Sequence, residues 1–192
     1  MRKKTGLRMG AFAPACFMML GNVSMNAYAQ SEPKENKVKI RLLSDTHYFS
    51  QSLYSDCDDF TTALNLDRKM LKESDAILNA ALDVIIQDKP DFVLVSGDLT
   101  KDGEQVNHEA FASKLTKAKE ELADKGVDTN FYVINGNHDI NNAHGNDFSS
   151  GHAVDADRTT VEEFKEIYKD LDMEKILFSI VRKATEAEVF LM

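Results

Sequence analysis

Three short apolar runs in this chain each stop abruptly on side chains that can bind a metal ion. The runs cover residues 38–43, 91–96 and 130–135. The polar stretches that end them are Asp45-Thr46-His47, Gly97-Asp98 and Gly136-Asn137-His138-Asp139. Short apolar runs bounded by turn residues predict buried strands. A fold in which the three runs are strands of one sheet would gather these side chains at one edge.

Apolar residues at helical spacing fill both intervals between the runs. In the first interval they are Ile77, Leu78, Ala81, Leu82, Ile85 and Ile86, ahead of Pro90. In the second, within residues 104–125, they are Val106, Phe111, Leu115, Ala118 and Leu122, ahead of Gly126. Proline ends helices and glycine caps them. The chain therefore reads as βαβαβ, an α/β fold with a mostly parallel sheet and right-handed crossovers.

In such a sheet the ligand site lies outside the carboxyl ends of the strands. Carboxylate, imidazole and amide donors without a thiolate suit divalent transition metals. Taken one at a time, an Asp-x-His or a Gly-Asp after a strand is mostly turn chemistry. Together, at three strand ends, they predict one shared metal site.

The rest of the domain is less regular. Residues 50–67 show no dominant period and read as a loop with a short helix at most. Residues 141–158 are rich in Asn, Asp, Gly, Ser and His, and so long an irregular stretch is usually a functional loop or disordered. Thr160 and Glu163 have capping-box spacing and predict a helix that carries Phe164, Ile167, Tyr168 and Leu171.

The first 29 residues have the pattern of a secretory signal peptide. A basic start precedes an apolar stretch, and Ala27-Tyr28-Ala29 is a small-x-small cleavage site. The apolar stretch is interrupted by Pro14 and Gly21 and falls short of the roughly 20 residues that span a bilayer. We therefore expect export after cleavage near Ala29, no membrane span in the mature chain, a linker at 30–37 and one domain over 38–192.

Composition supports a single acidic globular domain, because 43% of the 192 residues are hydrophobic and 29% are charged. The chain carries 32 Asp and Glu against 23 Lys and Arg, and four of the basic residues lie in the predicted signal peptide. Phosphate backbones are held by positive surface, so this charge argues against a nucleic-acid partner. Cys57 would be the only cysteine left after cleavage, which excludes an internal disulfide.

The three motifs, in this order, resemble those of the calcineurin-like metallophosphoesterases over about residues 38–170. The stretch from Gly97 to Gly103 is similar to that of the bacterial branch related to cyclic-nucleotide phosphodiesterases. The resemblance implies an exported hydrolase of phosphate mono- or diesters with two divalent metal ions. Mn, Fe, Zn and Co all remain open as the metal.

For individual residues, the resemblance implies that Asp45 and His47 bind the first ion and that Asp98 bridges both ions. Asn137 would bind the second ion. Hydrolysis of a phosphate ester needs an activated water and positive charge against the phosphoryl oxygens, and a pair of metal ions supplies both.

The resemblance further implies that His138 faces the substrate and protonates or stabilises the leaving oxygen. Asp102 or Asp139 would orient its ring. Among the other histidines, His108 is either an exposed helix residue or a support for the site. His144 and His152 lie in the long irregular stretch and are expected to be solvated.

The chain departs from the family after residue 152, where no further histidine follows. Family members bring a Gly-His and a Gly-His-x-His from the second half of an α-β-β-α sandwich. We therefore expect an amino-terminal βαβαβ half whose second sheet is missing or incomplete. The alternative to an active phosphoesterase is a non-catalytic truncated remnant that binds at most one metal tightly.

Overall fold

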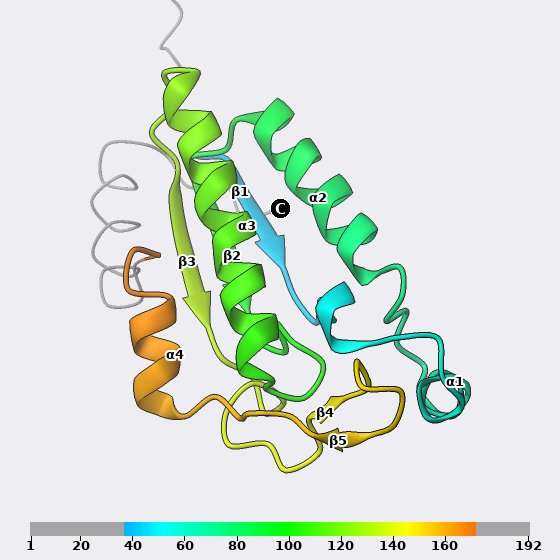
Figure 1. Ribbon diagram of the computed structural model, residues 1–192. Helices are drawn as coiled ribbons and strands as arrows, with labels where there is room; N and C mark the ends of the chain where they lie inside the picture. The colour runs from blue at the N-terminus through cyan, green and yellow to red at the C-terminus, as the bar shows by residue number, and fades with distance from the viewer. Residues whose placement is uncertain (1–36, 172–192) are drawn as a thin grey trace, which may run out of the picture. The chain divides into compact units, whose positions relative to one another are not determined.

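The computed structural model describes residues 37–171 (Figure 1). The predicted signal peptide, all but the last residue of the predicted linker and the tail from residue 172 lie outside these residues. None of the helices among residues 37–171 has the length and apolarity that crossing a bilayer requires.

Three parallel strands form the sheet: β1 (Ile40–Leu43), β2 (Phe92–Ser96) and β3 (Asn130–Ile134). They lie in the order β1-β2-β3, and the arrows of the two outer strands, β1 and β3, run the same way in Figure 1. Leu43 pairs with Val95, which pairs with Val133. The predicted α/β class and parallel sheet are confirmed.

Two long helices make the crossovers, α2 (Ser74–Asp88) and α3 (Gln105–Asp124). Helix α2 ends on Lys89 in the left-handed conformation, directly before Pro90. After α3, Gly126 has a φ of +73° and its N–H donates to the carbonyl of Ala123 at 2.8 Å. Both predicted helix ends are confirmed: Pro90 cannot continue α2, and Gly126 readily adopts the positive φ after α3.

The core lies between these helices and one face of the sheet. Leu78 and Leu82 of α2 and Leu115 and Leu122 of α3 are buried there with Val93 of β2. The apolar stripes predicted for the two helices each contain one error. Ile77 and Val106 are exposed, because helical spacing alone does not show where the packing partners of a stripe end.

All the described helices that join this core lie on one face of the sheet, as Figure 1 shows for α2, α3 and α4 (Val161–Ile167). On the opposite face, Leu42 is 64% exposed and Ile134 is 45% exposed. Among residues 37–171 the only further strands are the two-residue pair β4 (Asn146–Asp147) and β5 (Val154–Asp155). The described residues therefore contain one three-stranded sheet and not a second sheet of comparable size.

A second, smaller cluster of buried residues joins the segment after β1 to the long irregular stretch. It includes the 3-10 turn η1 (Gln51–Leu53) and the helix α1 (Asp58–Leu66), where the sequence predicted at most a short helix. Its buried members are Phe49, Leu53, Phe60, Leu71 and Phe148. Phe148 comes from the turn between β4 and β5, so the predicted irregular stretch is anchored by packing.

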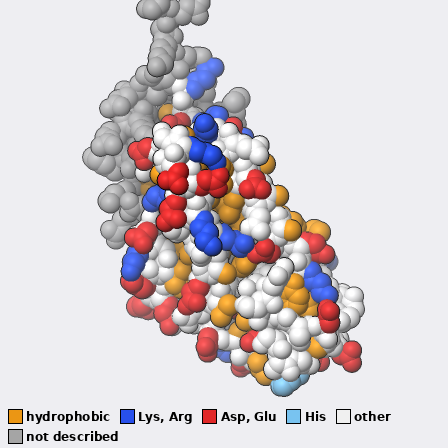
Figure 2. All heavy atoms as spheres, turned by 45° about the horizontal axis from the view of Figure 1, so that its top comes forward, with side chains coloured by type: hydrophobic (Ala, Val, Ile, Leu, Met, Phe, Trp, Pro, Cys, Tyr) orange, Lys and Arg blue, Asp and Glu red, His pale blue; other side chains and the backbone are white. Residues whose placement is uncertain are grey.

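Helix α4 begins with the predicted capping box. The Thr160 hydroxyl accepts from the N–H of Glu163 at 3.2 Å, and the Glu163 carboxylate accepts from the N–H of Thr160 at 2.8 Å. Phe164, Tyr168 and Leu171 are buried in the main core as expected. On the face drawn in Figure 2, acidic and basic side chains are interspersed and form no extended basic patch.

Candidate metal centre

Three loops leave the carboxyl ends of the strands and carry the predicted site residues. We name them loop 1 (residues 44–50, after β1), loop 2 (97–104, after β2) and loop 3 (135–142, after β3). Backbone hydrogen bonds continue from the sheet into loops 1 and 2: the N–H of His47 donates to the carbonyl of Asp98 at 3.0 Å, and that of Tyr48 to Leu99 at 2.8 Å. Loops 1 and 2 are thus held side by side.

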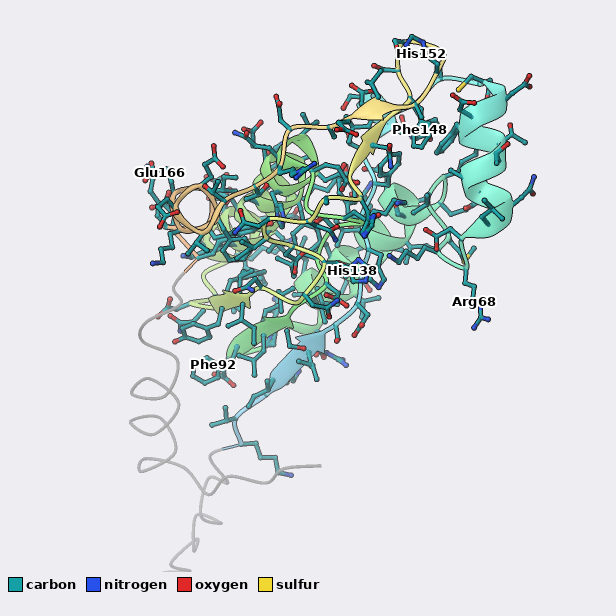
Figure 3. All side chains as sticks on the ribbon, turned by 90° about the horizontal axis from the view of Figure 1, so that it is seen from below. Arg68, Phe92, His138, Phe148, His152 and Glu166 are labelled. Carbon is teal, nitrogen blue, oxygen red and sulfur yellow. The ribbon has the colours of Figure 1, made fainter. Side chains whose placement is uncertain are left out.

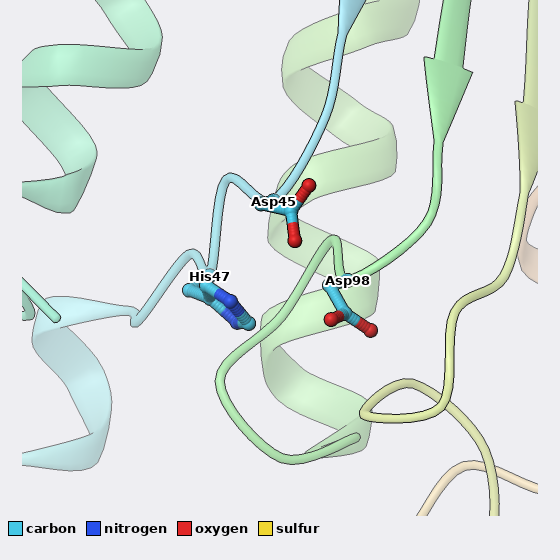
Figure 4. Close-up of side chains that lie close together, drawn as sticks. All are labelled: Asp45, His47 and Asp98. Carbon is cyan, nitrogen blue, oxygen red and sulfur yellow. The ribbon is translucent and has the colours of Figure 1, made fainter.

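Asp45, His47 and Asp98 converge where these two loops meet (Figure 4). One possible ligand atom from each lies within 4.8 Å of the others. Two carboxylates and an imidazole form a mixed oxygen and nitrogen donor set, which fits a divalent transition metal. The sequence predicted the same three residues as ligands that share one ion.

The backbone at these three residues is strained. Asp45, His47 and Asp98 have φ values of +53°, +41° and +48°, in the left-handed region that residues other than glycine adopt only rarely. Each such residue costs on the order of 1–3 kcal/mol and persists only where its surroundings enforce it. Strain that coincides with all three donors indicates that the loops are shaped to aim these side chains.

Loop 3 touches loop 2 through glycine. A Cβ atom on Gly136 would lie 2.2 Å from Oδ1 of Asp98 and 2.4 Å from its backbone nitrogen, which no side chain could tolerate. Gly97, with a φ of +81°, lies on the loop 2 side of the same contact: a Cβ added to it would lie 2.9 Å from the Cα of Gly136. Both glycines directly precede predicted ligands, where the absence of a side chain lets the backbone turn sharply and leaves room for metals and phosphate.

His138 extends from loop 3 toward the three donors. The backbone N–H of His138 donates to Oδ1 of Asp98 at 3.1 Å. The His138 ring lies edge-on to the ring of His47, with centroids 5.1 Å apart. Nδ1 of His138 lies 2.8 Å from Oδ1 of Asp102. This contact occupies Nδ1 and leaves Nε2 without a protein partner among the described residues.

Asp102 is buried beside a cation. Burial alone would raise the pKa of its carboxyl group, but Lys101, whose ammonium binds Oδ2, and His138 lower the pKa overall. The carboxylate therefore stays ionised and can orient the His138 ring. Between the two alternatives left by the sequence, the structure places Asp102 against the ring.

Asp139 faces the other way. Its Oδ2 accepts from the N–H of Gly136 at 2.7 Å, and its Oδ1 accepts from the N–H of Thr100 at 3.0 Å and from the Thr100 hydroxyl at 3.2 Å. The side chain is fully buried and makes no contact with the His138 ring in the described hydrogen bonds. Adjacent residues in a turn point to different sides, so Asp139 ties loop 3 to loop 2 instead of orienting the histidine.

Asn137 lies in loop 3 between Gly136 and His138, and its side chain is exposed. Its binding of a second ion stays a prediction.

The other histidines divide clearly. His144 and His152 are exposed, as predicted, and Figure 3 shows His152 at the tip of the β4–β5 segment, far from His138. His108 is fully buried, so the exposed alternative for this residue is wrong. A single histidine near the start of an amphipathic helix gave no signal for its burial, because its partners come from distant segments.

A hollow of about 450 Å³ opens beside Asp45 and His47. Arg68 and Lys69 line it together with apolar residues of α2 such as Ile77. Burial lowers the pKa of His47, and the nearby Lys69 ammonium lowers it further. His47 is therefore held as the neutral imidazole, the form that binds metals.

Comparison with known families gives one finding that bears on this site. The model of the calcineurin-like phosphoesterase family matches residues 38–182, a span that includes all three loops. No curated protein matches the chain.

Proposed function

The chain belongs to the calcineurin-like phosphoesterase family, and from this premise we propose that it hydrolyses phosphate mono- or diesters at a site for two divalent metal ions. The observation that carries the proposal is the convergence of Asp45, His47 and Asp98 on strained loops at the carboxyl edge of the sheet. Such strain is costly and is expected where geometry serves binding.

In this proposal Asp45 and His47 would hold the first ion, Asp98 would contribute to both ions, and Asn137 would hold the second. Divalent ions bound there would activate a water molecule and offset the negative charge of the phosphoryl group. The donor set fits Mn, Fe, Zn or Co.

His138 acts on the substrate side. Asp102 accepts from its Nδ1, so that Nε2 is the atom that delivers a proton to the leaving oxygen of the ester. The His138 ring is part-exposed, and the backbone N–H of His138 is held by the Asp98 carboxylate. Both observations support a position of the ring next to a bound phosphate.

We also propose that the enzyme acts outside the cytoplasm. The support is the predicted signal peptide at residues 1–29, with its basic start and its small-x-small site at Ala27 and Ala29.

The test pairs Asp98→Asn with Asp83→Asn, an exposed residue of α2. Asparagine keeps the shape and the acceptor for His138 but removes the negative charge. We expect Asp98→Asn to weaken Mn²⁺ binding at least about tenfold and to abolish hydrolysis of an aryl phosphate, whereas Asp83→Asn changes neither.

Metal titration and a colorimetric assay on the same samples give the answer. Equal behaviour of the two variants would contradict the proposed role of Asp98. Tight binding of a single ion without hydrolysis in the unmodified chain would favour the non-catalytic alternative.

A further inference from the structure

Asn107 and His108 are adjacent residues near the start of α3, and between them they form hydrogen bonds with all three loops. The proposed chemistry uses neither residue. Both side chains are fully buried. Successive residues of a helix point about 100° apart, so neighbours on one turn can reach different segments.

Asn107 joins loop 1 to loop 2. Its Oδ1 accepts from the N–H of Ser50 in loop 1 at 2.8 Å, and its Nδ2 donates to Oε2 of Glu104 at 2.7 Å. The same Oε2 accepts from the N–H of Asp102 at 3.1 Å. A buried chain of hydrogen bonds therefore runs from the loop that carries His47 to the residue that orients His138.

Glu104 is an unusual member of this chain. Burial raises the pKa of its carboxyl group, and its Oε1 has no hydrogen-bond partner among the described residues. A buried carboxyl group is costly unless its acceptors are used. Part of this cost is offset because Oε2 accepts from both Asn107 and the backbone N–H of Asp102.

His108 joins loop 2 to loop 3. Its Nε2 lies 2.9 Å from the carbonyl oxygen of Asp139 and 3.2 Å from the hydroxyl of Thr100. A carbonyl only accepts, so Nε2 carries the proton and Nδ1 accepts from the Tyr168 hydroxyl at 2.9 Å. Burial lowers the pKa of His108, in agreement with this neutral form.

We propose that Asn107 and His108 are positioning residues that hold the three loops in the register at which the metal donors converge. The inference rests on the proposed function, since it concerns the same site. Helix α3 is packed in the core along its length, whereas the loops carry strained residues that need an external constraint. The pair on the helix supplies that constraint at two points.

The test compares Asn107→Leu and His108→Leu with Leu122→Ala. Leucine has the same branched arrangement of heavy atoms as asparagine but cannot make its hydrogen bonds. Leu122 is a buried residue at the far end of the same helix. All three variants are expected to melt at a lower temperature. His108→Gln, which can still donate to Asp139 and accept from Tyr168, serves as the conservative rescue.

Two readouts separate positioning from simple packing, both at a temperature well below unfolding. Amide hydrogen exchange is measured on peptides that cover the three loops, and Mn²⁺ affinity is measured by titration. We expect both leucine variants to speed exchange at the His47 and Tyr48 amides, which neither residue contacts, and to weaken Mn²⁺ binding about tenfold. Leu122→Ala is expected to leave both at the level of the unmodified chain, and His108→Gln to restore most of the affinity.

If the leucine variants lower only the melting temperature, as Leu122→Ala does, Asn107 and His108 are ordinary core residues and the inference is wrong. Faster exchange confined to the Ser50 amide would also overturn it, because the effect would then be local. If the unmodified chain binds no Mn²⁺, the proposed function fails, while hydrogen exchange still decides whether the pair holds the loops.

Discussion

The helix-covered face of the sheet and the three loops at its carboxyl edge are held together by different forces. The former is apolar and regular, with side chains such as Val93, Val133 and Leu115 completely buried. The three loops bury polar groups, among them Thr100 and Asp139, and contain four residues other than glycine with a positive φ. Apolar burial depends mainly on area and volume, whereas hydrogen bonds and backbone strain depend on the position of each atom.

Because of this difference, we expect the free energy of unfolding and the affinity for metal to respond to different substitutions. A change in the packed layer should lower the free energy of unfolding and leave metal affinity nearly intact. A change in the loops should affect metal affinity whatever it does to stability.

The largest effect is expected for Gly136→Ala, which places a methyl group against both the backbone and the carboxylate of Asp98. The two loops must separate, so we expect a loss of about 4 kcal/mol in unfolding free energy and no measurable metal binding. Gly126→Ala is the matched control, because it has a positive φ but nothing within 4 Å of the new Cβ. It should cost about 1 kcal/mol and leave metal binding unchanged. Urea denaturation and Mn²⁺ titration measure the two quantities, and similar losses in both variants would refute the close-approach argument.

Leu115→Ala tests the packed layer. The residue is fully buried in the middle of α3, and its truncation should cost about 3 kcal/mol through lost burial and a residual cavity. Mn²⁺ affinity measured below the melting temperature should change less than about twofold, because additivity holds for distant sites. A large fall in affinity would show that the two regions are coupled.

The pH dependence of stability should report on His108. Burial lowers its pKa below the ordinary value of 6.5, so the unfolded chain binds a proton that the folded chain does not. Stability from this residue is therefore complete above pH 6.5 and is lost as pH falls below it, by at most about 1.4 kcal/mol per pH unit. The Asp139 carboxylate, whose Oδ1 lies 3.8 Å from Nε2 of His108, raises this pKa, but burial outweighs it and the pKa stays lowered. Thr100 and Tyr168 also face the ring and carry no charge.

The measurement is urea denaturation at pH 7.5 and 5.5 for the unmodified chain and for His108→Gln. Glutamine does not titrate, so the variant should lose less stability over this interval. His47, whose pKa is also lowered by burial, leaves a remaining slope in both proteins. An identical pH dependence would mean that His108 is not held neutral.

The smallest effect isolates backbone strain. Asp45→Gly and Asp45→Ala both remove the carboxylate, but only glycine adopts a φ of +53° without cost. The glycine variant should be more stable than the alanine variant by about 1 kcal/mol, while both lose metal affinity. Thermal unfolding without added metal checks the difference, and equal stability would mean that the loop relaxes around alanine.

Local chemistry explains why much of the fold could be predicted. Helix α3 ends just ahead of Gly126, because a residue without Cβ adopts the positive φ there at little cost. Helix α4 follows its N-cap Thr160, because the capping box is complete within four residues. The parallel direction of the strands followed from the βαβαβ pattern. Exposure of Ile77 and Val106 could not be predicted, because spacing gives the direction of a side chain but not where its packing partner ends.

The candidate site divides in the same way. Sequence position is enough to place three side chains at the carboxyl edge, because Asp45, His47 and Asp98 directly follow strands that run parallel and end at the same edge. The folding of distant segments onto one another decided that Asp102 meets His138 while Asp139 is buried against Thr100. It also decided that Asn107 and His108 support the loops. These contacts join residues 31 to 57 positions apart in the chain, and local propensity carries no information about such pairs.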